Sequence, residues 1–218
     1  MQGKTHRVGG VLSAMIGYTV LEANNMLIPD VNPLLQLAVM YPFAMYGSVV
    51  SDLDHNWNSA PSKDPVSKVI NTVLHLTSNV RKNSGNNVPL LSVFDAKHRS
   101  WQTHSDLFLL LFVFIVVMLW NSANDVNGII FKLIMLGFSL GLASHLILDS
   151  LTPEGIWFIG PSIVKREKVT FKLVPKKDFF VTGGPWEKLI RSIMWVVIAI
   201  LSIYILYKAS PYRISFNF

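Results

Sequence analysis

Long apolar blocks separated by short polar stretches dominate the chain. A helix needs about 20 apolar residues to cross a bilayer. The blocks predict five membrane helices, at roughly 8–27, 34–50, 106–122, 129–148 and 189–207. The third block (LFLLLFVFIVVMLW) and the fifth (IMWVVIAILSIYILY) are the most uniformly apolar. The pattern therefore predicts an all-α polytopic membrane protein.

Polar residues interrupt the first two blocks. Glu22 and Asn24 lie near the end of the first block, and Gln36 and Pro42 lie within the second. We expect these two helices to pack against protein rather than lipid. Residues 1–21 also resemble a signal peptide, but no small-x-small cleavage pattern follows them, so we expect the segment to be retained.

Two shorter elements are predicted between the membrane helices. The segment DPVSKVINTVLHLTS (64–78) has an N-cap residue, a proline at the first helical position and one apolar stripe, which predicts a cytoplasmic amphipathic helix. Residues 168–184 alternate apolar and polar around a Pro-Lys-Lys turn, which predicts a small β-hairpin in the loop after helix four. The sequence has no internal repeat, so 1–218 is expected to be a single membrane-embedded domain.

Composition supports a membrane protein and limits its chemistry. Of 218 residues, 51% are hydrophobic and only 15% are charged, which is too apolar for a soluble domain of this length. The net charge of +6 reflects the loops of a membrane protein, and we expect no nucleic-acid partner. The chain has no cysteine, so a metal site would use imidazole and carboxylate ligands.

The connections between the blocks differ sharply in charge. Residues 28–33 and 121–128 contain no Lys or Arg, whereas 51–105 and 150–188 are rich in both. The positive-inside rule places the basic connections and the N-terminus in the cytoplasm.

Histidines and aspartates gather at those same cytoplasmic ends of different helices. They lie before the first block, in SDLDH (51–55) after the second, in KHRSWQTHS (97–105) before the third, and in SHLILDSLTPEG (144–155) at the end of the fourth. The topology rests on Lys and Arg alone, so this clustering is independent of it. It predicts a site for one or two divalent ions, with Zn expected first and Mn or Fe as alternatives. The expected ligands are His6, Asp52, Asp54, His55, His98, His104, His145 and Asp149.

The spacing of His145 and Asp149 supports the predicted metal site, whereas single histidines also have simpler explanations. His145 and Asp149 lie one helical turn apart and face the same way. A single interfacial histidine is often only a polar tip reaching for water, and His145 could simply hydrogen-bond a neighbouring helix. Neither explains why all these groups lie on one side of the membrane. His75 lies beside the amphipathic stripe, and Glu22 lies about 24 Å of helical rise from His6, so both are excluded.

The motifs also carry a resemblance to a known family. GKTHRVGG (3–10), SDLDH, KHRSWQTHS, SHLILDSLTPEG and TGGPWEKLIR (182–191) occur in this order. Together they resemble the YdjM-like family of predicted inner-membrane metal-dependent hydrolases. The resemblance implies a multi-pass protein of the prokaryotic inner membrane, phospholipase-like chemistry, and metal-binding and catalytic positions at the eight residues given above.

The expected function is hydrolysis of a phosphoester in a lipid or lipid-linked substrate at the cytoplasmic interface, with membrane lipid as the partner. Asp54 would hold or activate the attacking water, Arg99 would stabilise phosphoryl charge, and His104 is the third catalytic position. One alternative is a non-catalytic regulatory membrane protein stabilised by metal. A metal transporter is disfavoured, because Lys132, Glu22 and Arg191 lie near helix ends and the mid-membrane stretches otherwise lack the ionisable groups that a transport path needs.

Overall fold

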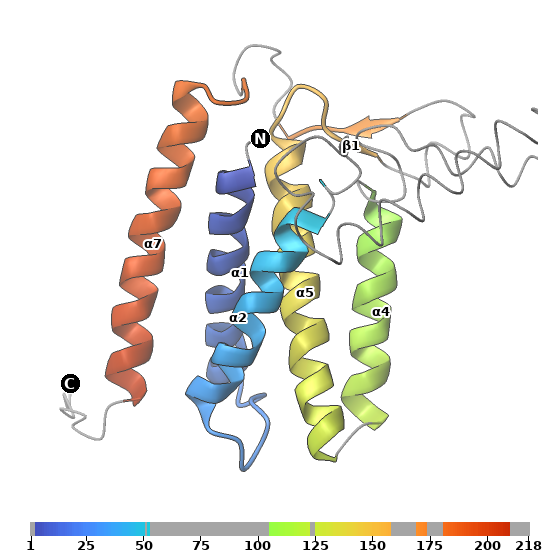
Figure 1. Ribbon diagram of the computed structural model, residues 1–218, viewed down its shortest axis with the longest axis vertical. Coiled ribbons are helices and arrows are strands. Elements are labelled where there is room, and N and C mark those ends of the chain that lie inside the picture. The colour runs from blue at the N-terminus through green and yellow to red at the C-terminus, as the bar shows by residue number, and fades with distance from the viewer. Residues whose placement is uncertain are drawn as a thin grey trace, which may run out of the picture.

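The computed structural model describes residues 3–50, 52, 105–122, 125–157, 169–173 and 181–209. Within them the chain forms a bundle of five helices that run alternately up and down (Figure 1). The predicted amphipathic helix at 64–78 lies outside the described residues. The helices are α1 (Gly3–Ala23), α2 (Pro33–Val50), α4 (Asp106–Ser122), α5 (Val126–Ser150) and α7 (Pro185–Ala209).

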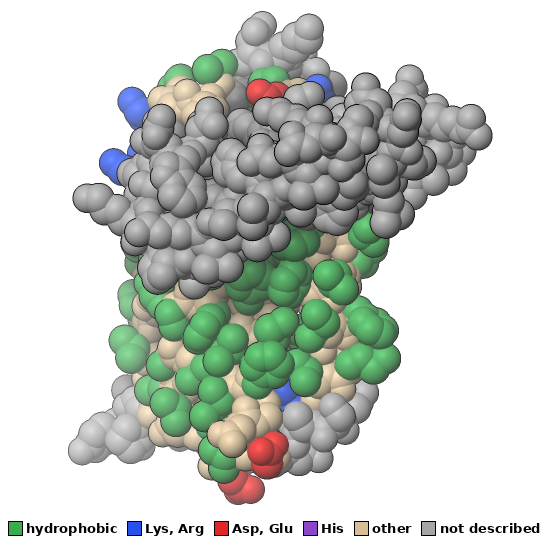
Figure 2. All heavy atoms as spheres, turned by 45° about the vertical axis from the view of Figure 1, so that its right-hand side comes forward, with side chains coloured by type: hydrophobic (Ala, Val, Ile, Leu, Met, Phe, Trp, Pro, Cys, Tyr) green, Lys and Arg blue, Asp and Glu red, His purple; other side chains and the backbone are tan. Residues whose placement is uncertain are grey.

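Each predicted block is a helix, and three of the five are long and apolar enough to cross a membrane. These three are α2, α5 and α7, while α4 is apolar but shorter, at 17 residues. Hydrophobic side chains cover the middle of the bundle surface, and acidic side chains appear at its lower end (Figure 2). The mostly helical membrane fold is therefore confirmed. The helix starts differ from the prediction, because α1 begins at Gly3 and so includes His6.

The closest packing in the bundle joins α2 to α5, which make the most extensive interhelical contact. A side-chain carbon at Gly141 would lie 2.0 Å from the carbonyl oxygen of Ala44, and one at Gly47 would lie 2.2 Å from the carbonyl oxygen of Phe138. Only glycine allows two backbones to approach so closely, as is common between membrane helices. The expectation that the second block packs against protein is therefore confirmed.

The side chain of Gln36 explains one polar residue inside that block. It is buried, with its amide nitrogen donating to the carbonyl oxygens of Ile28 (2.9 Å) and Val31 (3.0 Å). Its amide oxygen accepts from the backbone N–H of Ile28 at 3.0 Å. Gln36 thus satisfies backbone groups of the turn between α1 and α2, which would otherwise lack partners in an apolar setting.

Helix α7 lies at the edge of the bundle and packs against α1. Its other faces expose large apolar side chains such as Trp195 and Ile203, as expected of a helix that contacts lipid. The buried residues shared by the two helices are Val8, Val11, Met15 and Tyr18 with Met194, Ile198 and Ile205.

A small antiparallel sheet follows α5. Strand β1 (Ile156–Trp157) pairs with β2 (Thr170–Phe171), with Ile156 opposite Phe171. Within the predicted hairpin of 168–184, only Thr170–Phe171 is a strand among the described residues, and it pairs with the segment that precedes the predicted hairpin. Gly155, at φ 67°, reverses the chain after α5 and makes this pairing possible. The Pro-Lys-Lys turn of the predicted hairpin lies outside the described residues.

Candidate metal centre

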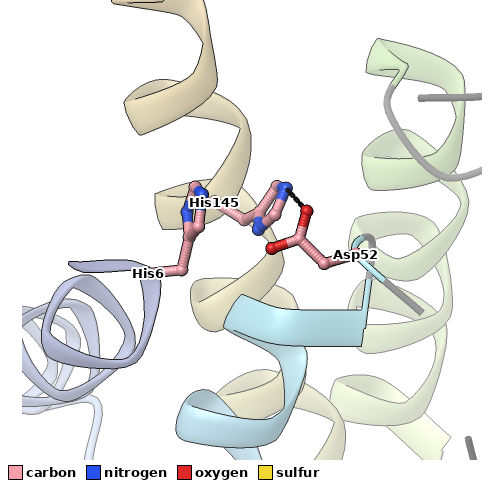
Figure 3. A group of neighbouring side chains, drawn as sticks. All are labelled: His6, Asp52 and His145. Atoms are coloured by element: carbon pink, nitrogen blue, oxygen red, sulfur yellow. Dashed lines mark ion pairs between the residues drawn. The ribbon is translucent and has the colours of Figure 1, made fainter. Parts of the chain in front are cut away.

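Four ionisable side chains meet at the end of the bundle where α1 begins and α2 and α5 end. His6 comes from α1, Asp52 follows α2, and His145 and Asp149 come from the last turns of α5. Figure 3 shows His6, His145 and Asp52 converging from these three elements. The side chains of His6, His145 and Asp149 are at most 1% exposed, whereas Asp52 is 27% exposed. Asp52 therefore lies on the open side of the cluster.

The distances within the cluster suit a shared ion better than direct hydrogen bonds. Nε2 of His6 lies 3.4 Å from Oδ1 of Asp149, and Nε2 of His145 lies 3.4 Å from Oδ2 of the same carboxylate. Nε2 of His145 lies 3.9 Å from Oδ1 of Asp52. Good N–H···O bonds are about 2.7–3.2 Å long. Two ligand atoms bound to one zinc ion at about 2.0–2.2 Å lie roughly 3–3.5 Å apart.

One donor atom from each of His6, Asp52 and His145 can be chosen so that all three lie within 4.8 Å of one another. Small shifts of these side chains would bring the three atoms onto one ion. The fourth group, Asp149, faces both imidazoles through its two oxygens. The donor set of two imidazoles and two carboxylates fits Zn, Mn or Fe.

A backbone contact fixes the orientation of the His145 ring. Its Nδ1 lies 2.7 Å from the carbonyl oxygen of Ser48 on α2. A carbonyl oxygen only accepts, so Nδ1 carries a hydrogen and Nε2 is the ring atom that faces Asp149 and Asp52. Metal-binding histidines commonly donate their second ring N–H to a carbonyl or carboxylate in this way.

The ring of His6 stacks on that of His145, with centroids 3.9 Å apart and planes at 22°. His6 precedes the apolar run of α1, and burial, followed by the proximity of His145, lowers its pKa to about 4. The imidazole is therefore neutral at pH 7, which is the form that binds metal. Within the described part of the chain, Nδ1 of His6 has no hydrogen-bond partner.

Two glycines after His6 bring α1 close to its neighbours. A side-chain carbon at Gly10 would lie 2.5 Å from the carbonyl oxygen of Ala44 on α2, and one at Gly9 would lie 2.7 Å from Cδ1 of Leu148 on α5. This close approach places His6 beside the ends of α2 and α5. Gly9 and Gly10 of GKTHRVGG therefore serve the geometry of the site.

Sequence reasoning missed Glu187, which joins the start of α7 to the start of α1. Its side chain is 1% exposed and accepts from the Thr5 hydroxyl (2.5 Å) and from the backbone N–H of Gly183 (2.6 Å). Thr5 precedes His6, so this contact anchors the segment that carries a predicted ligand. A glutamate in a first helical turn usually indicates only a capping residue, and the sequence does not reveal a partner 182 positions away.

The comparisons with known proteins agree with the motifs. The sequence profile of the YdjM inner membrane protein family matches residues 1–213. The chain belongs to this family. A relative, the uncharacterized protein YvsG of Bacillus subtilis (strain 168), is 28% identical over 166 residues, which is 76% of each chain. No solved structure matches.

The YdjM-family chain thus brings four of its eight predicted ligands together, namely His6, Asp52, His145 and Asp149. These four come from segments up to about 140 residues apart in sequence, so their meeting depends on the tertiary fold. The remaining predicted site residues, Asp54, His55, His98, Arg99 and His104, lie outside the described residues.

Proposed function

We propose that this YdjM-family chain is a membrane-bound metal-dependent hydrolase that cleaves a phosphoester of a lipid or lipid-linked substrate at the cytoplasmic interface. The observation that carries the proposal is the cluster of two imidazoles and two carboxylates at one end of a bundle of apolar helices. His145 and Asp149 lie within the last six residues of α5. If α5 crosses the membrane, this end of the helix would approach the level of the lipid head groups.

The four clustered residues would hold one or two divalent ions. Zinc fits the imidazole and carboxylate donors best, and manganese or iron would also bind them. A divalent ion bound there would supply Lewis acidity toward a phosphoryl oxygen and a water activated near neutral pH.

Residues of the chain would orient the ligands, accept a proton and bind the phosphoryl group. His145 is held by Ser48 and Asp149, so its Nε2 keeps a fixed direction. Asp149 is fully buried, which suits a ligand more than a proton acceptor that must meet substrate. Asp54, two positions after the half-open Asp52, would take the proton of the attacking water. Arg99 would bind the phosphoryl oxygens, and His104 would complete the catalytic set.

A direct assay tests the proposal. Purified full-length protein loaded with Zn²⁺ or Mn²⁺ is incubated with bacterial inner-membrane lipid extract, and products are followed by mass spectrometry. We expect metal-dependent release of a phosphorylated head group or of phosphate. His145→Ala should abolish this release, whereas His75→Ala, which alters the only histidine excluded from the site, should retain it.

Absence of hydrolysis by the metal-loaded protein would contradict the proposal. If the wild-type protein carries stoichiometric metal and hydrolyses no phosphoester in the extract, the hydrolase proposal is wrong. The metal would then serve a regulatory or structural role.

A further inference from the structure

Two adjoining cavities lie at the end of the bundle opposite the metal centre. The larger, of about 550 Å³, is bounded by the turn between α1 and α2 and by the facing ends of α4 and α5, and Asp30, Trp120 and Lys132 contribute to its lining. The smaller, of about 300 Å³, is lined entirely by apolar residues, among them Leu21, Val117 and Leu136. Both volumes fall in the range of small-molecule sites.

The two cavities share Met26 and Trp120, so they adjoin along the same two side chains. The larger includes two charged residues, Asp30 and Lys132, in a mostly apolar lining, and the smaller is wholly apolar. An amphiphile has the same division, with a polar head joined to a hydrocarbon chain. Trp120 lies where the two cavities meet. Tryptophan is favoured at boundaries between polar and apolar surroundings in membrane proteins, because its ring is apolar and its N–H is polar.

Lys132 gives the larger cavity its chemical preference. Its side chain is only 6% exposed although it lies in the second turn of α5, a helix otherwise apolar enough to cross the membrane. Ionisable residues within membrane helices commonly mark binding sites. A phosphate placed against Lys132 would form a charge-assisted contact with it.

Asp30 lines the same cavity from the α1–α2 turn and carries the opposite charge. A head group with both a phosphate and an ammonium could therefore complement both residues. This charge pattern favours a zwitterionic phospholipid over an anionic one.

We propose that these cavities bind one zwitterionic phospholipid, with its phosphate at Lys132, its ammonium toward Asp30 and an acyl chain along Leu21, Val117 and Leu136. Lys132 and His145 are separated by 13 residues of α5, or about 20 Å of helical rise. The bound lipid therefore has its head group in the opposite leaflet from the metal centre. It is a resident lipid, distinct from the substrate proposed above.

Tryptophan quenching tests the site without measuring hydrolysis or metal. Full-length protein in detergent is titrated with phosphatidylethanolamine carrying dibrominated acyl chains, because bromine quenches a tryptophan that it contacts. We expect a saturable component at one lipid per chain, and Trp120→Phe should remove that component. Lys132→Gln should raise the lipid concentration at the midpoint of this component about tenfold, the effect of losing one charge-assisted contact.

Three controls make the result decisive. Lys132→Arg keeps the charge and should restore the wild-type midpoint. Lys208→Gln removes a lysine from the last turn of α7, at the same end of the bundle, and should leave the midpoint unchanged. Brominated diacylglycerol, which lacks the phosphate, should give no saturable component. Persistence of that component in Trp120→Phe, an unchanged midpoint in Lys132→Gln, or equal binding of diacylglycerol would each overturn the proposal.

Discussion

The carbonyl oxygen of Ser48 accepts a hydrogen bond from Nδ1 of His145, at 2.7 Å. The bond joins the end of α2 to the end of α5, requires a hydrogen on Nδ1 and fixes the plane of the imidazole. Ser48 contributes through its backbone, so replacing its side chain does not remove the acceptor. The direction of Nε2 therefore depends on how closely α2 packs against α5.

Loss of the His145 imidazole should empty the metal centre. His145→Ala removes a proposed ligand that lies close to both carboxylates, and we expect bound metal to fall at least tenfold, in line with the effect of even indirect partners of metal ligands. Elemental analysis of the purified protein measures the result. His75→Ala is the control, and equal metal content in the two variants would contradict the ligand assignment.

Metal removal should destabilise the wild-type protein and leave an Asp149→Asn variant little changed. An ion that binds only the folded state raises the melting temperature, and the variant lacks the carboxylate that faces both imidazoles. Thermal unfolding in detergent, with and without EDTA, measures this difference. If EDTA leaves the wild-type melting temperature unchanged, the assignment of the cluster as a metal site is contradicted.

A methyl group at Gly141 should separate α2 from α5. The added carbon would lie 2.0 Å from the carbonyl oxygen of Ala44, so the helices must move apart. We expect Gly141→Ala to lower the free energy of unfolding by about 1–3 kcal/mol, the usual cost of overpacking. Denaturation in detergent measures it. Gly3→Ala is the matched control, since a carbon there meets nothing within 4 Å, and a comparable loss in both variants would contradict the close approach.

The contact between Thr5 and Glu187 should stabilise the junction of α1 and α7. Thr5→Val keeps the side-chain shape but removes the hydroxyl that donates to the buried carboxylate. We expect a loss of about 1–3 kcal/mol in the free energy of unfolding, because the carboxylate loses a hydrogen-bond donor in a buried setting. Thr19→Val is the comparison, since the Thr19 hydroxyl donates only to Met15 within α1. Equal losses in the free energy of unfolding would contradict a stabilising role for the contact between Thr5 and Glu187.

Reporter fusions test the orientation of the bundle. The basic connections predict that a reporter placed after Lys82 lies in the cytoplasm and one placed after Asp125 lies outside. Paired alkaline phosphatase and green fluorescent protein fusions at the two positions distinguish the sides. Cytoplasmic signals at both positions would contradict the prediction that α4, which lies between them, crosses the membrane.

The sequence predicted the helices well because a bilayer imposes long apolar blocks that are visible without the fold. It also predicted the shared face of His145 and Asp149, since helical spacing alone determines it. The polar residue Gln36 lies within α2 and binds the turn that precedes that helix.

Contacts between distant segments could not be predicted in the same way. The partner of β2 depends on the chain reversal at Gly155, and the partner of Glu187 lies on another helix. Similarly, the backbone acceptor for His145 leaves no trace in residue type, because every residue at position 48 would supply a carbonyl.

The glycine contacts between α2 and α5 have a consequence for how sequence change reaches the candidate metal centre. Where two backbones touch, there is no flexible side chain to absorb an added atom. A small substitution deep in the apolar half of this seam would therefore shift Ser48 relative to His145 without altering any ligand. Metal affinity could be tuned, or lost, from positions that no comparison of ligand residues would single out.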